Sequence, residues 1–170
     1  MYIEMEVDQV IIDPFIDSPS VILKEKGGDR ILVILIGYFE ALAILSELEK
    51  ISLSRPLTHD LIRDILSSTG INVEKVEIYD LIEDTYYASL CLSKNGQKIK
   101  LDCRPSDAIA IALRTGAKIY VKEEVIRKSE IEEKEHGKPL VIEELEETEL
   151  KEYKELIENI AGEDYYKWKM

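Results

Sequence analysis

The sequence predicts an α+β protein, in which a mixed or antiparallel sheet of hairpins is interleaved with three helices and followed by an acidic C-terminal helix. Gly27-Gly28 and Asn95-Gly96 each separate two runs of strand-forming residues, and such dipeptides indicate hairpin turns. Three segments with helical apolar spacing lie between and after these hairpins. This arrangement favours α+β over a doubly wound fold, in which single strands and helices alternate.

The composition is that of a globular protein. The 170 residues suffice for one compact domain, and 45% hydrophobic with 34% charged residues is not the composition of a disordered chain. The first residues alternate and carry acids, and the longest apolar run, residues 31–45, is interrupted by Gly37 and Glu40. The sequence therefore predicts neither a signal peptide nor a membrane span, and we expect a cytoplasmic protein without a membrane partner.

The net charge bears on whether the protein binds nucleic acid, and the cysteine content bears on whether it is reduced or disulfide-bonded. The chain has 35 acidic and 22 basic residues, a net charge of −13, which argues against non-specific binding to phosphate backbones. A local basic groove or a metal-bridged contact with nucleic acid stays open. Cys91 and Cys103 both lie in strand-like runs. Two thiols do not make a disulfide framework, so a reduced protein is the simplest interpretation, although a pairing between facing strands stays open.

The N-terminal part is predicted to form three strands and one helix. Residues 2–12 alternate and indicate a strand, and the runs around Gly27-Gly28 indicate a hairpin. The second strand of that hairpin, residues 31–36, is apolar on both faces and is therefore expected at the centre of the sheet. Residues 38–51 then have the spacing of a helix with one broad apolar face.

A second helix is expected after Arg55. Thr58 fits the N-cap, Asp60 lies in the first turn, where a carboxylate is favourable, and Gly70 ends the helix.

The segment from residue 71 to residue 121 is predicted to contain three strands, the third helix and a short strand. The three strands cover residues 71–103, with turns near residues 83–85 and at Asn95-Gly96. The third helix runs from Pro105 to about Thr115 and a short strand covers residues 118–121.

The C-terminal part is predicted to be mostly polar. Residues 123–139 are expected to be irregular, with at most one helical turn, and residues 142–161 form the acidic helix. We therefore divide the chain into a domain of residues 1–125 and a polar connector with a helical extension at residues 126–170.

Arg104, Ser106 and Asp107 stand at the start of the third helix, which is otherwise almost wholly apolar. One interpretation is purely structural, because Pro105 suits the first helical position and Asp107 at N3 can accept a hydrogen bond from the N-cap. The other is functional. Arg104 has no required capping role, and a helix N-terminus with Arg and Ser can hold a phosphate.

A second polar cluster, Arg55 to Asp60, precedes the second helix. Its His59 could be a general base, a metal ligand or a surface residue. Glu40 is the third polar position of interest, inside the apolar first helix. It either faces solvent or pairs with an arginine, because an unpaired buried carboxylate is too costly.

Three quoted segments carry a family resemblance: IGYFEALAI, RPLTHDLI and RPSDAIAIALRTGAKIYV, at residues 36–44, 55–62 and 104–121. In their order and separation they resemble the bifunctional nuclease domain family, formerly a conserved domain of unknown function, over roughly residues 7–125. The resemblance implies DNase and RNase activity and a wedge-shaped homodimer with the active site in a groove. Matching polar positions are Glu40, Arg55, His59, Asp60, Arg104, Ser106 and Asp107.

These positions suggest a metal-dependent nuclease that cleaves DNA and RNA. In this hypothesis Asp60 and Asp107, with Glu40 as a further candidate, hold Mg²⁺ or Mn²⁺, and His59 activates water or protonates the leaving oxygen. The substrate phosphate is bound by arginine and hydroxyl groups, namely Arg55, Arg104 and Ser106. Two alternatives stay open: a non-enzymatic dimeric anion-binding, nucleotide-binding or regulatory module, and polar clusters that serve only as caps and ion pairs.

Overall fold

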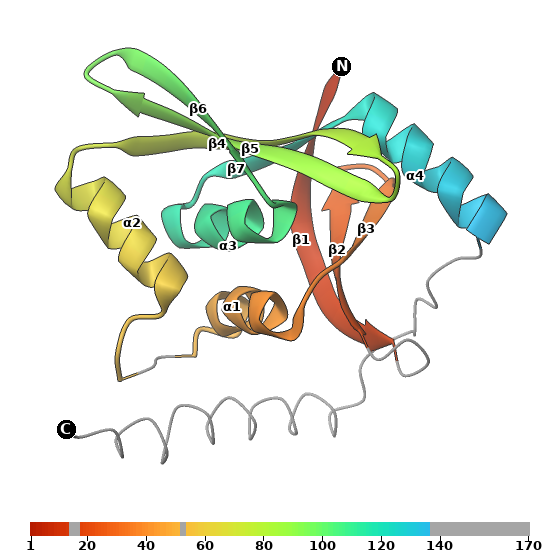
Figure 1. Ribbon diagram of the computed structural model, residues 1–170, viewed down its shortest axis with the longest axis horizontal. Helices are drawn as coiled ribbons and strands as arrows, with labels where there is room; N and C mark the ends of the chain where they lie inside the picture. The colour runs from red at the N-terminus through yellow and green to blue at the C-terminus, as the bar shows by residue number, and fades with distance from the viewer. Residues whose placement is uncertain (14–17, 52–53, 137–170) are drawn as a thin grey trace.

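The computed structural model describes residues 1–13, 18–51 and 54–136, which form one seven-stranded sheet and four helices (Figure 1). The strands are β1 (Tyr2–Asp13), β2 (Ser18–Glu25), β3 (Ile31–Leu35), β4 (Asn72–Ile82), β5 (Thr85–Lys94), β6 (Gln97–Cys103) and β7 (Lys118–Lys122). The helices are α1 (Tyr38–Leu48), α2 (Thr58–Ser68), α3 (Pro105–Thr115) and α4 (Glu123–His136).

The sheet is mixed, with the order β3-β2-β1-β7-β4-β5-β6. β7 pairs antiparallel with β1 and parallel with β4, and the other neighbours are antiparallel hairpin partners. The predicted turns are confirmed: Asp84 and Asn95 have positive φ angles of 58° and 51°, as tight hairpins require. The predicted α+β class is therefore confirmed.

The expected central position of the strand at residues 31–36 is wrong, because β3 is at one end of the sheet order. Its apolar character has another cause. Leu32 and Ile34 face the main core, whereas Val33 packs with Ile11 and Ile22 in a second, smaller cluster on the other face. On that second face Val33 is buried, whereas Ile31 and Leu35 are 48% and 57% exposed. The apolar pattern of this strand therefore did not indicate its position in the sheet.

Three helices, α1, α2 and α3, lie together against one face of the sheet (Figure 1). α3 is the central one and contributes Ala108, Ile109, Ala110, Ile111 and Ala112, all at most 3% exposed. Its small alanine side chains allow α1 to pack closely against it. α2 differs from both neighbours, because none of its residues is fully buried.

The segment expected to be irregular after residue 122 is instead the 14-residue helix α4. Val125 and Ile126 lie about one helical turn before Ser129 on the face that packs against β4 and β7, and all three are buried. Three apolar residues among many charges gave a weak periodic signal, so packing against the sheet decided this helix.

The division expected after residue 125 stays a prediction. Residues 137–170, which include the acidic helix expected at residues 142–161, lie outside the described residues. No helix in the described part of the chain is both long and apolar enough to cross a membrane. Cys91 and Cys103 are free thiols, and burial raises the pKa of Cys103 to about 11.

Candidate active site

The polar segments at the starts of α2 and α3 meet in space. The N-cap residues are Leu57 and Arg104, so His59 is the second residue of α2 and Asp107 is the third residue of α3. His59 Nε2 lies 3.1 Å from Asp107 Oδ1. The imidazole is only 12% exposed and the carboxylate 28%. Two sequence positions 48 residues apart therefore form one side-chain pair.

Arg104 extends this pair into a network across three helices. Its Nε and Nη2 atoms donate to the two Asp107 carboxylate oxygens, at 2.7 and 3.1 Å. Its Nη1 atom lies 2.8 Å from Glu40 Oε1 on α1. Of the two interpretations of Glu40, pairing with an arginine is thus the one observed. We call Glu40, His59, Arg104 and Asp107 the acid–base cluster.

Charge and hydrogen bonding fix the ionisation of Asp107. Burial would raise the pKa of its carboxyl, but hydrogen bonds from Arg104 and His59 and the positive charge of Arg104 outweigh burial and hold that pKa below its ordinary value. Hydrogen bonding to Asp107 raises the pKa of the Arg104 guanidinium further, so it stays cationic. Asp107 is therefore an ionised acceptor. In the hydrogen bond between His59 and Asp107, the proton is carried by His59 Nε2.

This lowered pKa predicts a pH dependence of stability. A carboxyl whose pKa is lower in the folded state stabilises the fold above its unfolded pKa, and that contribution is lost as pH falls. Wild type should therefore lose more unfolding free energy than Asp107→Asn between about pH 5 and pH 3. Denaturant unfolding at several pH values in this window measures the difference. Equal pH slopes for the two proteins would contradict the assigned ionisation of Asp107.

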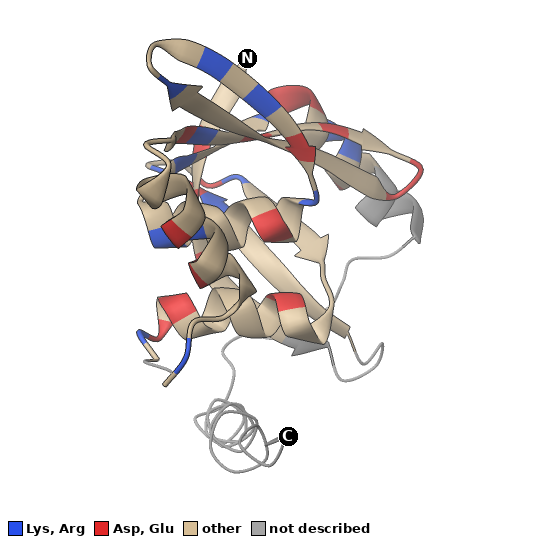
Figure 2. Cartoon of the chain, turned by 60° about the vertical axis from the view of Figure 1, so that its left-hand side comes forward, with Lys and Arg blue, Asp and Glu red and all other residues tan. Residues whose placement is uncertain are grey.

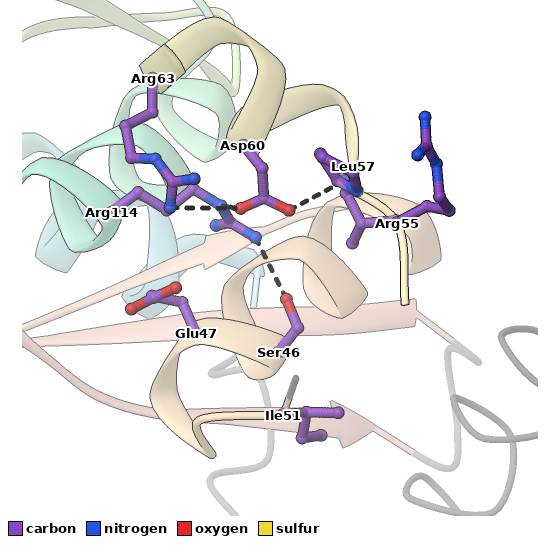
Figure 3. A pocket seen from close by; sticks show the side chains of 9 residues that line it. Ser46, Glu47, Ile51, Arg55, Leu57, Asp60, Arg63 and Arg114 are labelled. Carbon is purple, nitrogen blue, oxygen red and sulfur yellow. Dashed lines mark hydrogen bonds and ion pairs between the residues drawn. The ribbon is translucent and has the colours of Figure 1, made fainter. Parts of the chain in front are cut away.

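Asp60 contacts Leu57 and Arg114 (Figure 3), whereas its neighbour His59 contacts Asp107. Its Oδ2 atom accepts a hydrogen bond from the Leu57 backbone N–H at 2.8 Å, and its Oδ1 atom accepts one from Arg114 Nε at 2.7 Å. The expected N-cap, Thr58, is wrong: Leu57 occupies that position, and Asp60 supplies the capping acceptor from N3. Burial raises the pKa of Asp60, but the Leu57 and Arg114 hydrogen bonds outweigh it and lower that pKa overall.

A pocket of about 270 Å³ lies beside Asp60, between the end of α1, the start of α2 and α3. It contains Arg55, whose side chain points away from Asp60 in Figure 3. Arg55 thus lines the pocket beside Asp60, whereas Arg104 pairs with Glu40 and Asp107. Ser106 is only 6% exposed, which limits its access to a substrate phosphate. Of the seven positions expected to be functional, the structure thus brings four together, the members of the acid–base cluster.

The Asp60–Asp107 pair does not fit a metal ion in this arrangement. Both Asp60 oxygens accept hydrogen bonds from Leu57 and Arg114, and both Asp107 oxygens accept from Arg104. Among residues 1–13, 18–51 and 54–136, no three His, Cys, Asp or Glu side chains form a group that could hold a metal ion. Glu40 and Asp107 remain the two carboxylates that face one another, across Arg104.

Arg114 is the residue that the sequence analysis missed. It follows Asp107 by seven residues, which is about two helical turns, so both lie on one side of α3. The signal was available as a single arginine near the end of an otherwise apolar helix. Its significance depended on the acceptors that α1 and α2 supply, and these are far away in the sequence.

The cluster has the composition of an acid–base site. His59 is held by Asp107 through one ring nitrogen, so its other ring nitrogen can accept or deliver a proton. The side chain of Arg104 is 65% exposed and can contact an anion. Fold and site together define an α+β protein with a candidate hydrolytic centre between three helices. Residues 21–134 match the bifunctional nuclease domain, and the chain belongs to that family.

Individual relatives agree with this assignment. The chain is 37% identical over 162 residues to an uncharacterized protein of Mycobacterium tuberculosis. This match covers 95% of this chain and 97% of the relative. It is 33% identical over 110 residues to Bifunctional nuclease 1 of Oryza sativa subsp. indica and 30% identical over 107 residues to Bifunctional nuclease 2 of Arabidopsis thaliana. These matches cover 62% and 61% of this chain, but only 33% and 32% of the plant proteins.

Proposed function

We propose that this protein is a nuclease that hydrolyses phosphodiester bonds of DNA and RNA at the acid–base cluster. The observation that carries the proposal is the 3.1 Å contact between His59 Nε2 and Asp107 Oδ1, which joins the two polar segments across 48 residues. Membership of the nuclease family gives the reaction class. The plant relatives are named bifunctional nucleases. The DNA and RNA part of the proposal comes from the family resemblance of the sequence.

His59 is the proposed proton-transfer residue. With Nε2–H donated to Asp107, its Nδ1 atom is the basic nitrogen of the neutral ring and can take a proton from an attacking water. Asp107 fixes the tautomer and stabilises the cationic ring that forms. Arg104 is proposed to bind a non-bridging phosphate oxygen, because its side chain is 65% exposed and lies beside Asp107, the partner of His59. Arg55 is a second candidate for phosphate binding, outside the cluster.

Dependence on Mg²⁺ or Mn²⁺ is part of the proposal, and charge balance supports it. The cluster sets one guanidinium against two carboxylates, so an anionic phosphate needs additional positive charge. In this arrangement Arg104 occupies both Asp107 oxygens and one Glu40 oxygen. Asp107 and Glu40 would therefore hold the ion only once Arg104 has turned from them to the substrate phosphate, and the ion would neutralise charge on that phosphate. Homodimerisation and a cytoplasmic location stay predictions from the sequence.

The test is cleavage of supercoiled plasmid and of purified RNA by the purified chain, with Mg²⁺, with Mn²⁺ and with EDTA. We expect both substrates to be cleaved, with activity lost in EDTA and restored by either ion. Cleavage that persists in EDTA would remove the metal from the proposal and leave the His59–Asp107 pair. Stoichiometric binding of a nucleotide without any turnover would contradict the proposal and favour a non-enzymatic binding module.

A further inference from the structure

Arg114 carries a buried charge that is almost fully hydrogen-bonded. Its side chain is 1% exposed, and such a group is stable only when its donors find acceptors. Nε donates to Asp60 Oδ1 at 2.7 Å, Nη1 donates to the carbonyl oxygens of Ala43 and Ala110 at 2.8 and 3.0 Å, and Nη2 donates to Ser46 Oγ at 3.2 Å. Four of its five N–H donors are therefore used.

These acceptors come from all three helices of the layer. Ala43 and Ser46 belong to α1, Asp60 to α2, and Ala110 to α3 itself. Figure 3 shows the guanidinium of Arg114 between Asp60 above and Ser46 below. A single side chain thus connects α3 to both α1 and α2.

Packing alone holds α2 weakly. None of its residues is fully buried, and its apolar contact with the main core comes from partly buried Ile62 and Leu66. Apolar burial scales with the area removed from water, so the hydrophobic contribution to the position of this helix is small. The first turn of α2 is instead held by Asp60, which joins Leu57 of the N-cap to Arg114.

We infer that Arg114 is a positioning residue, which sets the distance between His59 and Asp107 by holding the first turn of α2 through Asp60. This inference rests on the proposed function for its catalytic consequence. His59 is the neighbour of Asp60 in the chain, and Asp107 stands about two turns before Arg114 on α3. The Asp60–Arg114 contact and the His59–Asp107 contact both join α2 to α3, so they are coupled. A shift of α2 that breaks the first contact also changes the distance in the second.

The primary variant is Arg114→Lys, which keeps the positive charge but replaces the planar guanidinium by one ammonium that cannot reach Asp60, Ala43 and Ser46 together. The second variant, Asp60→Asn, removes the charge of the acceptor on α2. Arg63→Lys is the matched control, because Arg63 lies on the same helix, is 40% exposed and pairs mainly with Asp64 at 2.8 Å. Its other contact, 4.0 Å from Asp60 Oδ1, is a long ion pair that needs only a positive charge, which lysine keeps. Circular dichroism and thermal unfolding report whether each variant is folded.

Two readouts separate positioning from general stability. With ¹⁵N-labelled histidine, the wild-type Nε2–H of His59 should give a ring N–H resonance protected by its bond to Asp107. We expect Arg114→Lys and Asp60→Asn to lose or shift this resonance at a temperature where both are folded. For cleavage, we expect kcat to fall about 10- to 100-fold with KM changed less than about threefold, because small misplacements of a reacting group cost rate. Arg63→Lys should match wild type in both readouts.

The outcomes are distinguishable. If folded Arg114→Lys keeps the wild-type His59 resonance, the inference is overturned, whatever happens to activity. If Arg114→Lys does not fold, Asp60→Asn decides in the same way. If the wild-type chain cleaves no nucleic acid but the resonance is lost only in Arg114→Lys and Asp60→Asn, the positioning role of Arg114 stands and the nuclease proposal falls.

Discussion

Replacing His59 by alanine is expected to lower the rate of phosphodiester cleavage by about 10²- to 10⁴-fold, the range that a positioned acid–base residue supplies. The variant should still fold, with some loss of stability from the broken His59–Asp107 contact, because α2 contributes no fully buried residue to the core. Initial rates on a defined oligonucleotide, measured with wild type and His59→Ala purified in parallel, test this result.

Two further variants sharpen the experiment. His136→Ala changes the second of the two histidines of the chain and should leave the rate within about twofold. The double variant His59→Ala/Asp107→Asn should lose little more than His59→Ala alone, because residues that act as one unit give non-additive losses. Losses of the two single variants that multiply in the double variant would show that His59 and Asp107 act independently. Full activity of His59→Ala would place the catalytic centre elsewhere.

Ile109→Ala is expected to destabilise the fold by about 2–5 kcal/mol, the range for emptying a buried aliphatic site. Ile109 is 0% exposed near the middle of α3, the helix that carries both Asp107 and Arg114. A cavity there removes contacts between α3 and its neighbours, and the packed layer cannot fully collapse into it. Chemical denaturation followed by circular dichroism measures the unfolding free energy.

Ile131→Ala is the control for this stability measurement. Ile131 lies on α4 and is 56% exposed, so its truncation should change the unfolding free energy by less than about 0.5 kcal/mol. Equal effects of the two substitutions would mean that α3 is not the centre of the core. Because the free energy is measured without substrate, this result is independent of the proposed chemistry.

The backbone signals in the sequence determined much of the fold. Pro105 and Gly116 fixed both ends of α3, since proline suits the first helical position and Gly116 adopts a positive φ of 69° after the last one. Asn95-Gly96 fixed the hairpin of β5 and β6 in the same way. These signals are local: the residue itself restricts the backbone, and no partner far away in the chain is needed. The family segments likewise marked four residues that do meet.

Tertiary packing decided which side chain meets which. His59 and Asp60 are neighbours, but successive residues on a helix point about 100° apart, so they reach different parts of α3. The sequence could not tell which of them would meet Asp107, because the answer depends on how α2 is rotated against α3. Tertiary packing also decided the position of β3 at the end of the sheet, where it pairs with β2, and the formation of α4, which packs against β4 and β7. Local chemistry sets the backbone of each element, whereas the partners of its side chains exist only once the layers have packed.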